Sequence, residues 1–307
     1  MRKRILTMSL VMVMVLSFTA CDKEPSAQEI VDGVIESFDN IRTYQFDMVT
    51  TQDMTGEAED EAFEQTVTMD ISGRLDLENV QMRADLTMNV NMAAPEEDEM
   101  EEGVEMYIID GMMYAKPEAP GEEPVWTKEV APVEVWESMS GISGLENYKE
   151  LLKTAQVKVI GSEKVKGVDC YELQLTPEMT QLWQIAMRPA GEVVRGGILS
   201  TVTEELLEEV FRSFSVKQWI AKDTYFLMRV EIDIAMDMTM EENPEIMDYF
   251  GQEGEMTMDI TLSFLAYNYN QPVSIELPLE AGGLEEMIED RGPFWSPDGS
   301  RIAFTSQ

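Results

Sequence analysis

The sequence contains no histidine, and this absence excludes several classes of site chemistry. Serine–histidine and cysteine–histidine catalysis need an imidazole base, and many zinc sites need imidazole ligands. Carboxylates are so frequent that no pair stands out as an acid–base couple. There is no glycine-rich phosphate loop. We therefore predict no enzyme, no catalytic residues, no metal site and no cofactor.

Cysteine is almost as rare, with only Cys21 and Cys170 in 307 residues. Cys21 follows a basic head, an apolar run and small residues, which is typical of an export signal. The stretch SFTAC resembles a bacterial lipobox, whose cysteine carries lipid and becomes the first mature residue. We predict a signal peptide over 1–20, a palmitate-bearing Cys21 and a tether over 21–26. The alternatives are cleavage with a free Cys21, or an uncleaved anchor. Cys170 has no activating partner and is predicted to be an ordinary strand residue.

Positive charge is also scarce, because 22 Lys and Arg face 60 Asp and Glu, for a net charge of −38. Such a surface repels phosphate backbones, so we predict no nucleic-acid partner. Much of the acid lies in three blocks between strand-like runs: 56–64, 95–105 and 117–124. None shows the ligand spacing of a calcium loop. We predict that they are solvated hairpin loops.

What the chain has in abundance is alternation of apolar and polar residues, the mark of strands with one dry face. The clearest case is VEIDIAMDMTM, residues 230–240. Tight turns are predicted at Asp110-Gly111, Lys166-Gly167 and Lys222-Asp223. Alternating runs occupy 44–48, 67–75, 84–92, 104–116, 156–176, 216–240 and 256–264.

Helical patterns are few. Ser26 and Glu29 have the spacing of a capping box, which predicts a helix over 27–38. Further helices are predicted over 143–155, 177–187 and 200–214. One-faced strands need a cover. The pattern predicts an α+β fold over 27–280, in which a curved, one-faced antiparallel sheet forms a half-barrel that wraps a few helices.

This organisation resembles the LolA/LolB and LppX/LprG group of bacterial lipoproteins over about residues 27–278. The resemblance rests on the lipobox, the opening helix before YQFDM, the DGMMYAK hairpin and the late stretch AKDTYFLMRVEIDIAMDM. It implies a LolA-like cavity between sheet and helices that holds acyl chains or another apolar ligand. It brings no catalytic motif.

The C-terminal stretch GPFWSPDGSRIAFTSQ resembles one repeat of the TolB-type β-propeller. We predict a partial repeat over 292–307, joined by a linker over 281–291. A half-blade cannot bury its own faces. It is therefore either the remnant of a longer fusion or a partner for a neighbouring sheet edge.

Methionine is the one enriched side chain, with 25 in the chain. Three explanations remain open for the methionines on strand faces: core packing, an apolar ligand cavity, or soft thioether ligands for copper(I). The cavity would be a groove covered by the 27–38 helix or the 201–214 helix. Its predicted lining is Met69, Ile71, Met88, Val90, Met236, Met238, Met240, Met256, Met258 and Phe264.

These observations predict an exported lipoprotein anchored in the cell membrane through Cys21, facing the periplasm or the cell exterior. Its predicted partners are the membrane, an apolar small ligand or lipid, and a possible protein partner. One alternative is a non-catalytic interaction domain of a larger propeller-containing envelope protein. The other is a methionine-rich copper(I)-binding protein.

Overall fold

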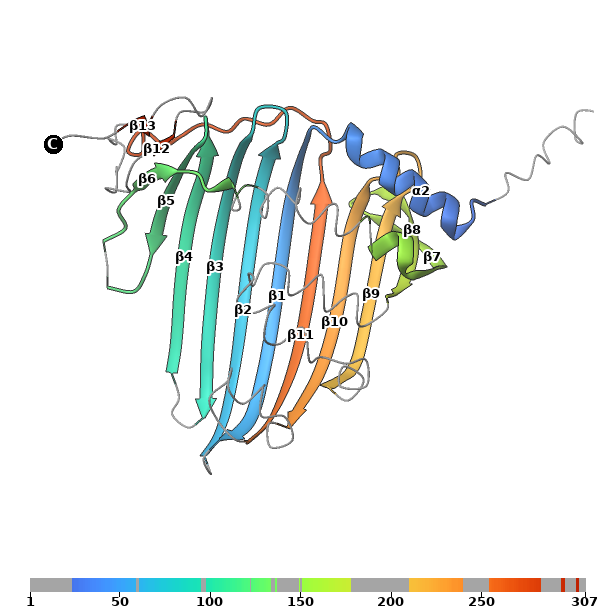
Figure 1. The fold of residues 1–307 in the computed structure, drawn as a ribbon, viewed down its shortest axis with the longest axis horizontal. Coiled ribbons are helices and arrows are strands. Elements are labelled where there is room, and N and C mark those ends of the chain that lie inside the picture. The colour runs from blue at the N-terminus through green and yellow to red at the C-terminus, as the bar shows by residue number, and fades with distance from the viewer. Residues whose placement is uncertain are drawn as a thin grey trace, which may run out of the picture.

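One antiparallel sheet of 11 strands dominates the computed structural model (Figure 1), and its strand order is β6-β5-β4-β3-β2-β1-β11-β10-β9-β8-β7. The chain is described over residues 24–58, 61–94, 98–121, 123–133, 136, 149, 151–177, 210–239, 254–282, 294–295 and 302–303. The strands are β1 (Thr43–Ala58), β2 (Glu61–Asp76), β3 (Gln81–Ala94), β4 (Asp98–Ile109), β5 (Met112–Glu118), β6 (Thr127–Val130), β7 (Gln156–Val165), β8 (Val168–Thr176), β9 (Phe211–Ala221), β10 (Leu227–Thr239) and β11 (Gly254–Tyr267).

The sheet consists of two meanders, because β1 to β6 and β7 to β11 each pair in chain order. They join where β1 pairs with β11 along most of its length, from Gln45 opposite Tyr267 to Ala58 opposite Gly254. The prediction of a single antiparallel sheet with few helices is therefore confirmed.

Helix α2 (Ala27–Ser37) begins at the predicted capping box and continues into a short 3₁₀ turn, η1 (Phe38–Asn40). The Glu29 amide donates to Ser26 Oγ at 3.2 Å, and the Ser26 amide donates to Glu29 Oε2 at 2.7 Å. The fully buried side chains of Ile30, Val31 and Val34 pack against β8 and β9. Figure 1 shows α2 at the β8–β10 side of the sheet. The predicted first helix is confirmed.

Two tight turns have the backbone that their sequences predict. Asp110 and Gly111 have φ angles of 53° and 75°, and Lys166 and Gly167 have φ angles of 48° and 87°. Two successive residues with positive φ suit the right-handed twist of the strands that they join. These turns fix the β4–β5 and β7–β8 hairpins.

The strands extend further than the sequence pattern predicts. The acidic blocks 56–64 and 95–105 are not simply loops, because β1 runs to Ala58, β2 starts at Glu61 and β4 starts at Asp98. Cross-strand pairing satisfies the backbone of these residues, while most of their acidic side chains remain exposed. Pairing with a long strand that is adjacent in the sequence therefore outweighs the low strand propensity of the Asp and Glu residues.

The predicted helix over 200–214 is wrong at its end, because Phe211 to Phe214 belong to β9 and pair with β10. Pairing with the sheet overrides the helical spacing of these residues. Residues 200–209, and residues 178–187 of the predicted helix over 177–187, lie outside the described residues. In the predicted helix over 143–155, Leu151 to Thr154 are helical. No helix among the described residues is long and apolar enough to cross a membrane.

After β11 the chain returns across β4 and β5. Ile275 and Ala281 pack against Tyr107 and Tyr114, and Ala281 is fully buried. Ala281, the first residue of the predicted linker, therefore packs with the sheet. Further on, β12 (Phe294–Trp295) and β13 (Ile302–Ala303) pair with each other as a separate two-stranded sheet. The likeness of this segment to a propeller repeat remains a prediction.

Candidate apolar ligand-binding face

Residues that lie opposite each other in an antiparallel pair share one face of the sheet. The register places Met69 opposite Met88, and it places Met258 opposite both Met54 and Met236. Through the intervening pairs, these methionines lie on the same face, which we call the apolar face. The opposite side carries residues such as Asp47, Asp70 and Asp85, and we call it the polar face.

At the end of the sheet where β1 starts, the apolar face is packed as a core. Phe46, Leu75, Met82 and Ile108 are buried there. Ile71 is 7% exposed and belongs to this cluster, and Phe264 packs against it. The rings of Phe46 and Phe264 are stacked, with centroids 6.1 Å apart. Ile71 and Phe264, both predicted to line a ligand groove, thus contribute to core packing.

Towards the β1–β2 hairpin, the same face becomes rich in thioethers. Met54, Met236 and Met258 lie side by side on β1, β10 and β11 and are half-buried, while Met256 is 8% exposed. Gln52 Nε2 donates to Met54 Sδ at 3.1 Å and to Met258 Sδ at 3.4 Å. We call Met54, Met236, Met256 and Met258 the thioether cluster. Its side chains are unbranched and polarizable, so they adapt to irregular partners.

On the other side of β1, the apolar face continues through Met69, Met88 and Val90, which are all half-buried. Met100, opposite Val90 on β4, is 42% exposed. These residues are separated from the thioether cluster by the polar side chains of β1, because Thr50 is opposite Met69. The predicted residues therefore share one face but form separate groups along it.

Helix α2 borders this face on the β8–β10 side. Its buried cluster includes Leu175 and Val216, and Ile232 of β10 packs against it. None of the predicted lining residues belongs to the cluster of α2, so a cover by the 27–38 helix remains a prediction. The side chain of Met238, whose backbone lies opposite Met256, is outside the described residues, as are Met240 and Cys21.

Sequence reasoning missed Met54 and Gln52 as neighbours of the predicted groups. Both lie in β1, where Thr50 and Gln52 interrupt the apolar alternation. The available signal was the apolar alternation that starts at Tyr44 and Phe46. Met54 is also at an even-numbered position, so it lies on the same face of the strand.

The described residues include one cysteine, Cys170, which lies on the polar face with Trp219 and Ala221. Cys170 is fully buried, and burial raises the pKa of its thiol, which keeps it protonated. Within the same residues, no group of three or more His, Cys, Asp or Glu side chains is arranged to hold a metal ion.

Several solved structures align with much of the chain at low similarity. The lipoprotein LppX of Mycobacterium tuberculosis is 13% identical, with a TM-score of 0.38, over 83% of this chain and 100% of that one. LprF from Mycobacterium bovis is 16% identical, with a TM-score of 0.37, over 83% and 98%. A putative outer membrane lipoprotein-sorting protein domain from Vibrio parahaemolyticus is 11% identical, with a TM-score of 0.20, over 81% and 95%.

TM-scores below 0.5 do not establish a common fold, so the LolA-like half-barrel remains a prediction. No curated protein matches the sequence. A family model described as "Family of unknown function (DUF6612)" matches residues 26–282, which span the whole 11-stranded sheet. The chain belongs to this family.

Proposed function

We propose that the protein is an exported lipoprotein that holds an apolar ligand, such as an acyl chain, against the apolar face of its sheet. One observation carries this proposal. Half-buried apolar side chains continue across β3, β2, β11 and β10, whereas the tightly packed core lies towards the end where β1 starts. Each methylene group of a ligand that leaves water there contributes about 0.8 kcal/mol.

The methionines suit a ligand whose shape varies. A core that only packs against itself favours Leu, Ile and Val, because their rotamers are well defined. The thioether cluster instead places flexible side chains on three neighbouring strands. Such a surface can adjust to chains of different length or unsaturation.

The proposed anchor is the lipidated Cys21. One acyl chain binds a membrane only marginally, whereas two anchor a protein stably. An anchored carrier of this kind would hold its ligand close to the membrane from which the ligand comes.

Mass spectrometry of lipids that co-purify with the full chain tests the proposal. The informative variant is Met258→Trp, which fills space at the thioether cluster without adding charge. Val49→Trp is the matched control, because Val49 is 40% exposed and lies on the polar face of β1. We expect non-covalent lipid with wild type and with the Val49 variant, and little with a folded Met258 variant. Absence of lipid from wild type, or equal lipid in both variants, would refute the proposal.

The row of thioethers also favours copper(I) as a second candidate ligand, because soft sulfur ligands select this ion. Met258→Leu separates the two functions, since leucine keeps the apolar volume but removes the sulfur. Copper(I) titration against a competing chelator should show binding by wild type and loss in this variant if copper is the ligand. Lipid binding, in contrast, should survive the leucine substitution.

A further inference from the structure

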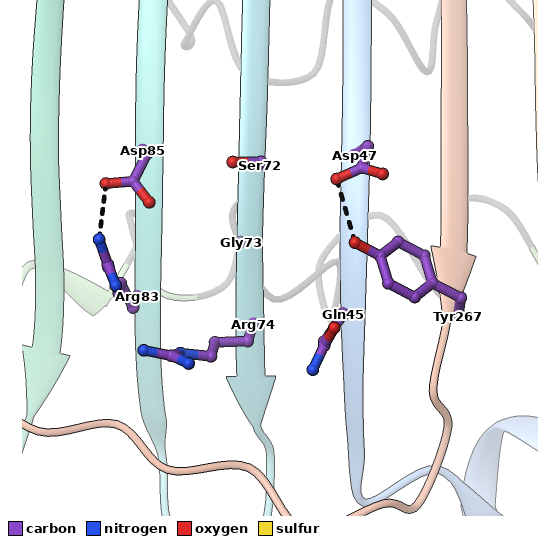
Figure 2. A pocket seen from close by; sticks show the side chains of 8 residues that line it. All are labelled: Gln45, Asp47, Ser72, Gly73, Arg74, Arg83, Asp85 and Tyr267. Carbon is purple, nitrogen blue, oxygen red and sulfur yellow. Dashed lines mark hydrogen bonds and ion pairs between the residues drawn. The ribbon is translucent and has the colours of Figure 1, made fainter.

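The polar face carries a cavity of about 230 Å³ that the proposed function does not use. Side chains from β1, β2, β3 and β11 line it, among them Gln45, Asp47, Arg74, Arg83 and Tyr267 (Figure 2). Because these residues lie on the side of the sheet opposite the apolar face, the cavity is separate from the proposed lipid site. We call it the Arg74 pocket.

Two arginines meet in this pocket as direct neighbours. Arg74 of β2 lies opposite Arg83 of β3, and Gln45 lies opposite Arg74 on its other side. Like charges that face each other across two strands destabilise a sheet. The pairing is unexpected here, because the chain has 60 acidic and 22 basic residues and carboxylate partners are abundant.

The two arginines are also incompletely satisfied. Arg83 Nη2 lies 3.3 Å from carboxylate oxygens of both Asp85 and Glu105. Arg74 makes no ion pair or side-chain hydrogen bond within the described part of the chain. The Nε atoms of both arginines are buried without an acceptor among the described residues. Buried donors without partners are costly, so a site that retains two of them calls for an explanation.

The acidic residues of the pocket are already engaged. Asp47 accepts a hydrogen bond from the Tyr267 hydroxyl at 3.2 Å, and Asp85 pairs with Arg83. Figure 2 shows Ser72 between these two carboxylates, and the Arg74 side chain extending towards β3. Ser72 and Arg74 both line the cavity. The Arg74 side chain therefore lines a cavity in which both carboxylates have other partners.

We propose that the Arg74 pocket binds the carboxylate group of a small ligand, with the guanidinium group of Arg74 as the main donor. A guanidinium fork matches a carboxylate in a planar, two-point contact. Asp47 and Asp85 repel a doubly charged anion more strongly than a singly charged one, which favours a carboxylate over a phosphate. The cavity is somewhat smaller than the usual range for drug-sized ligands, about 300–1,000 Å³, so the ligand is a small molecule.

Calorimetric titration of the full chain, purified in a non-ionic detergent at low ionic strength, tests this assignment. The probes are acetate, L-alanine and inorganic phosphate. L-Alanine adds an ammonium group that can approach Asp47, so we expect L-alanine to bind at least as tightly as acetate. We expect acetate and L-alanine to bind more tightly than phosphate. Arg74→Gln should weaken acetate binding by at least about tenfold, because hydrogen bonds to charged groups are strong. Arg74→Lys should also weaken it, because lysine lacks the fork.

The matched control is Arg212→Gln, which also removes an arginine from the polar face. Arg212 lies outside the pocket and pairs with Asp237 at 3.2 Å and Asp259 at 2.7 Å. This variant should bind acetate like wild type. No carboxylate binding by wild type, tighter binding of phosphate, or equal acetate binding by wild type and Arg74→Gln would each overturn the proposal.

Thermal unfolding distinguishes a binding role of Arg74 from a structural one. Because Arg74 faces another arginine and has a buried, unpaired donor, Arg74→Gln should leave the unfolding midpoint unchanged or raise it. Arg212→Gln should lower the midpoint, because it breaks two ion pairs. A fall for Arg74→Gln as large as that for Arg212→Gln would make Arg74 a structural residue and overturn the proposal. Neither readout depends on whether the apolar face binds lipid.

Discussion

Gly73 is a position where the packing of this sheet is sensitive to a single added carbon. It lies on the apolar face of β2, opposite Phe46 of β1. A Cβ atom at residue 73 would lie 2.6 Å from Phe46 Cε1 and 2.8 Å from the backbone oxygen of Arg83. Carbon atoms at optimal separation are about 3.5–4.0 Å apart. Gly73→Ala therefore forces about 1 Å of movement into the core.

The cost follows from how little room Phe46 has. Its ring is 6% exposed and stacked against Phe264, so it cannot rotate into solvent. Overpacking of this kind costs about 1–3 kcal/mol. Alanine restricts the unfolded chain and returns about 0.4–1 kcal/mol. The net expectation is a loss of up to about 2.6 kcal/mol, which for a chain of this size lowers the thermal midpoint by up to about 10 °C.

Gly103→Ala is the control with the opposite sign. The nearest atoms to a Cβ at residue 103 are 3.6 Å away, an ordinary contact, and its φ is not in the left-handed range. Only the restriction of the unfolded chain by alanine remains, so the thermal midpoint of the Gly103→Ala variant should rise slightly. Thermal unfolding followed by circular dichroism, with urea titration for the free energies, measures both. The double variant with Phe46→Leu should recover part of the loss at Gly73. If Gly73→Ala is as stable as Gly103→Ala, the reasoning is refuted.

Three further outcomes are expected. Burial alone raises the pKa of Glu105, but hydrogen bonds from Tyr107 and Lys116, together with the positive charges of Lys116 and Arg83, hold the pKa below its usual value. The stabilisation by Glu105 is therefore present above its unfolded-state pKa and is lost as the pH falls through its folded-state pKa. In a plot of the urea unfolding midpoint against pH, Glu105→Gln should reduce the fall in the midpoint at acidic pH. An unchanged fall would contradict the assignment. Cys21→Ser should abolish incorporation of labelled palmitate, and continued labelling would exclude this anchor. Deletion of 283–307 should leave the thermal midpoint unchanged, whereas a drop of several degrees would show that this segment stabilises the sheet.

Local signals in the sequence were sufficient for the elements that depend on neighbouring residues. Ser26 and Glu29 predicted the start of α2, and Asp110-Gly111 predicted a hairpin, because capping and tight turns involve residues only a few positions apart. Strict alternation predicted strands with one dry face, and the described methionines of the predicted site do share one face. Intrinsic helix and strand propensities predicted the secondary structure less well where pairing with a neighbouring strand determined it, as at Phe211 and in the acidic start of β4.

The tertiary structure alone decided which distant residues meet. The pairing of β1 with β11 brings Met54 next to Met258, across more than 200 residues, and the register of β2 with β3 sets Arg74 against Arg83. Alternation reveals the face on which a side chain lies but carries no information about the partner strand or its register. Both the thioether cluster and the Arg74 pocket arise from cross-strand neighbours, and these exist only once the two meanders have joined into one sheet.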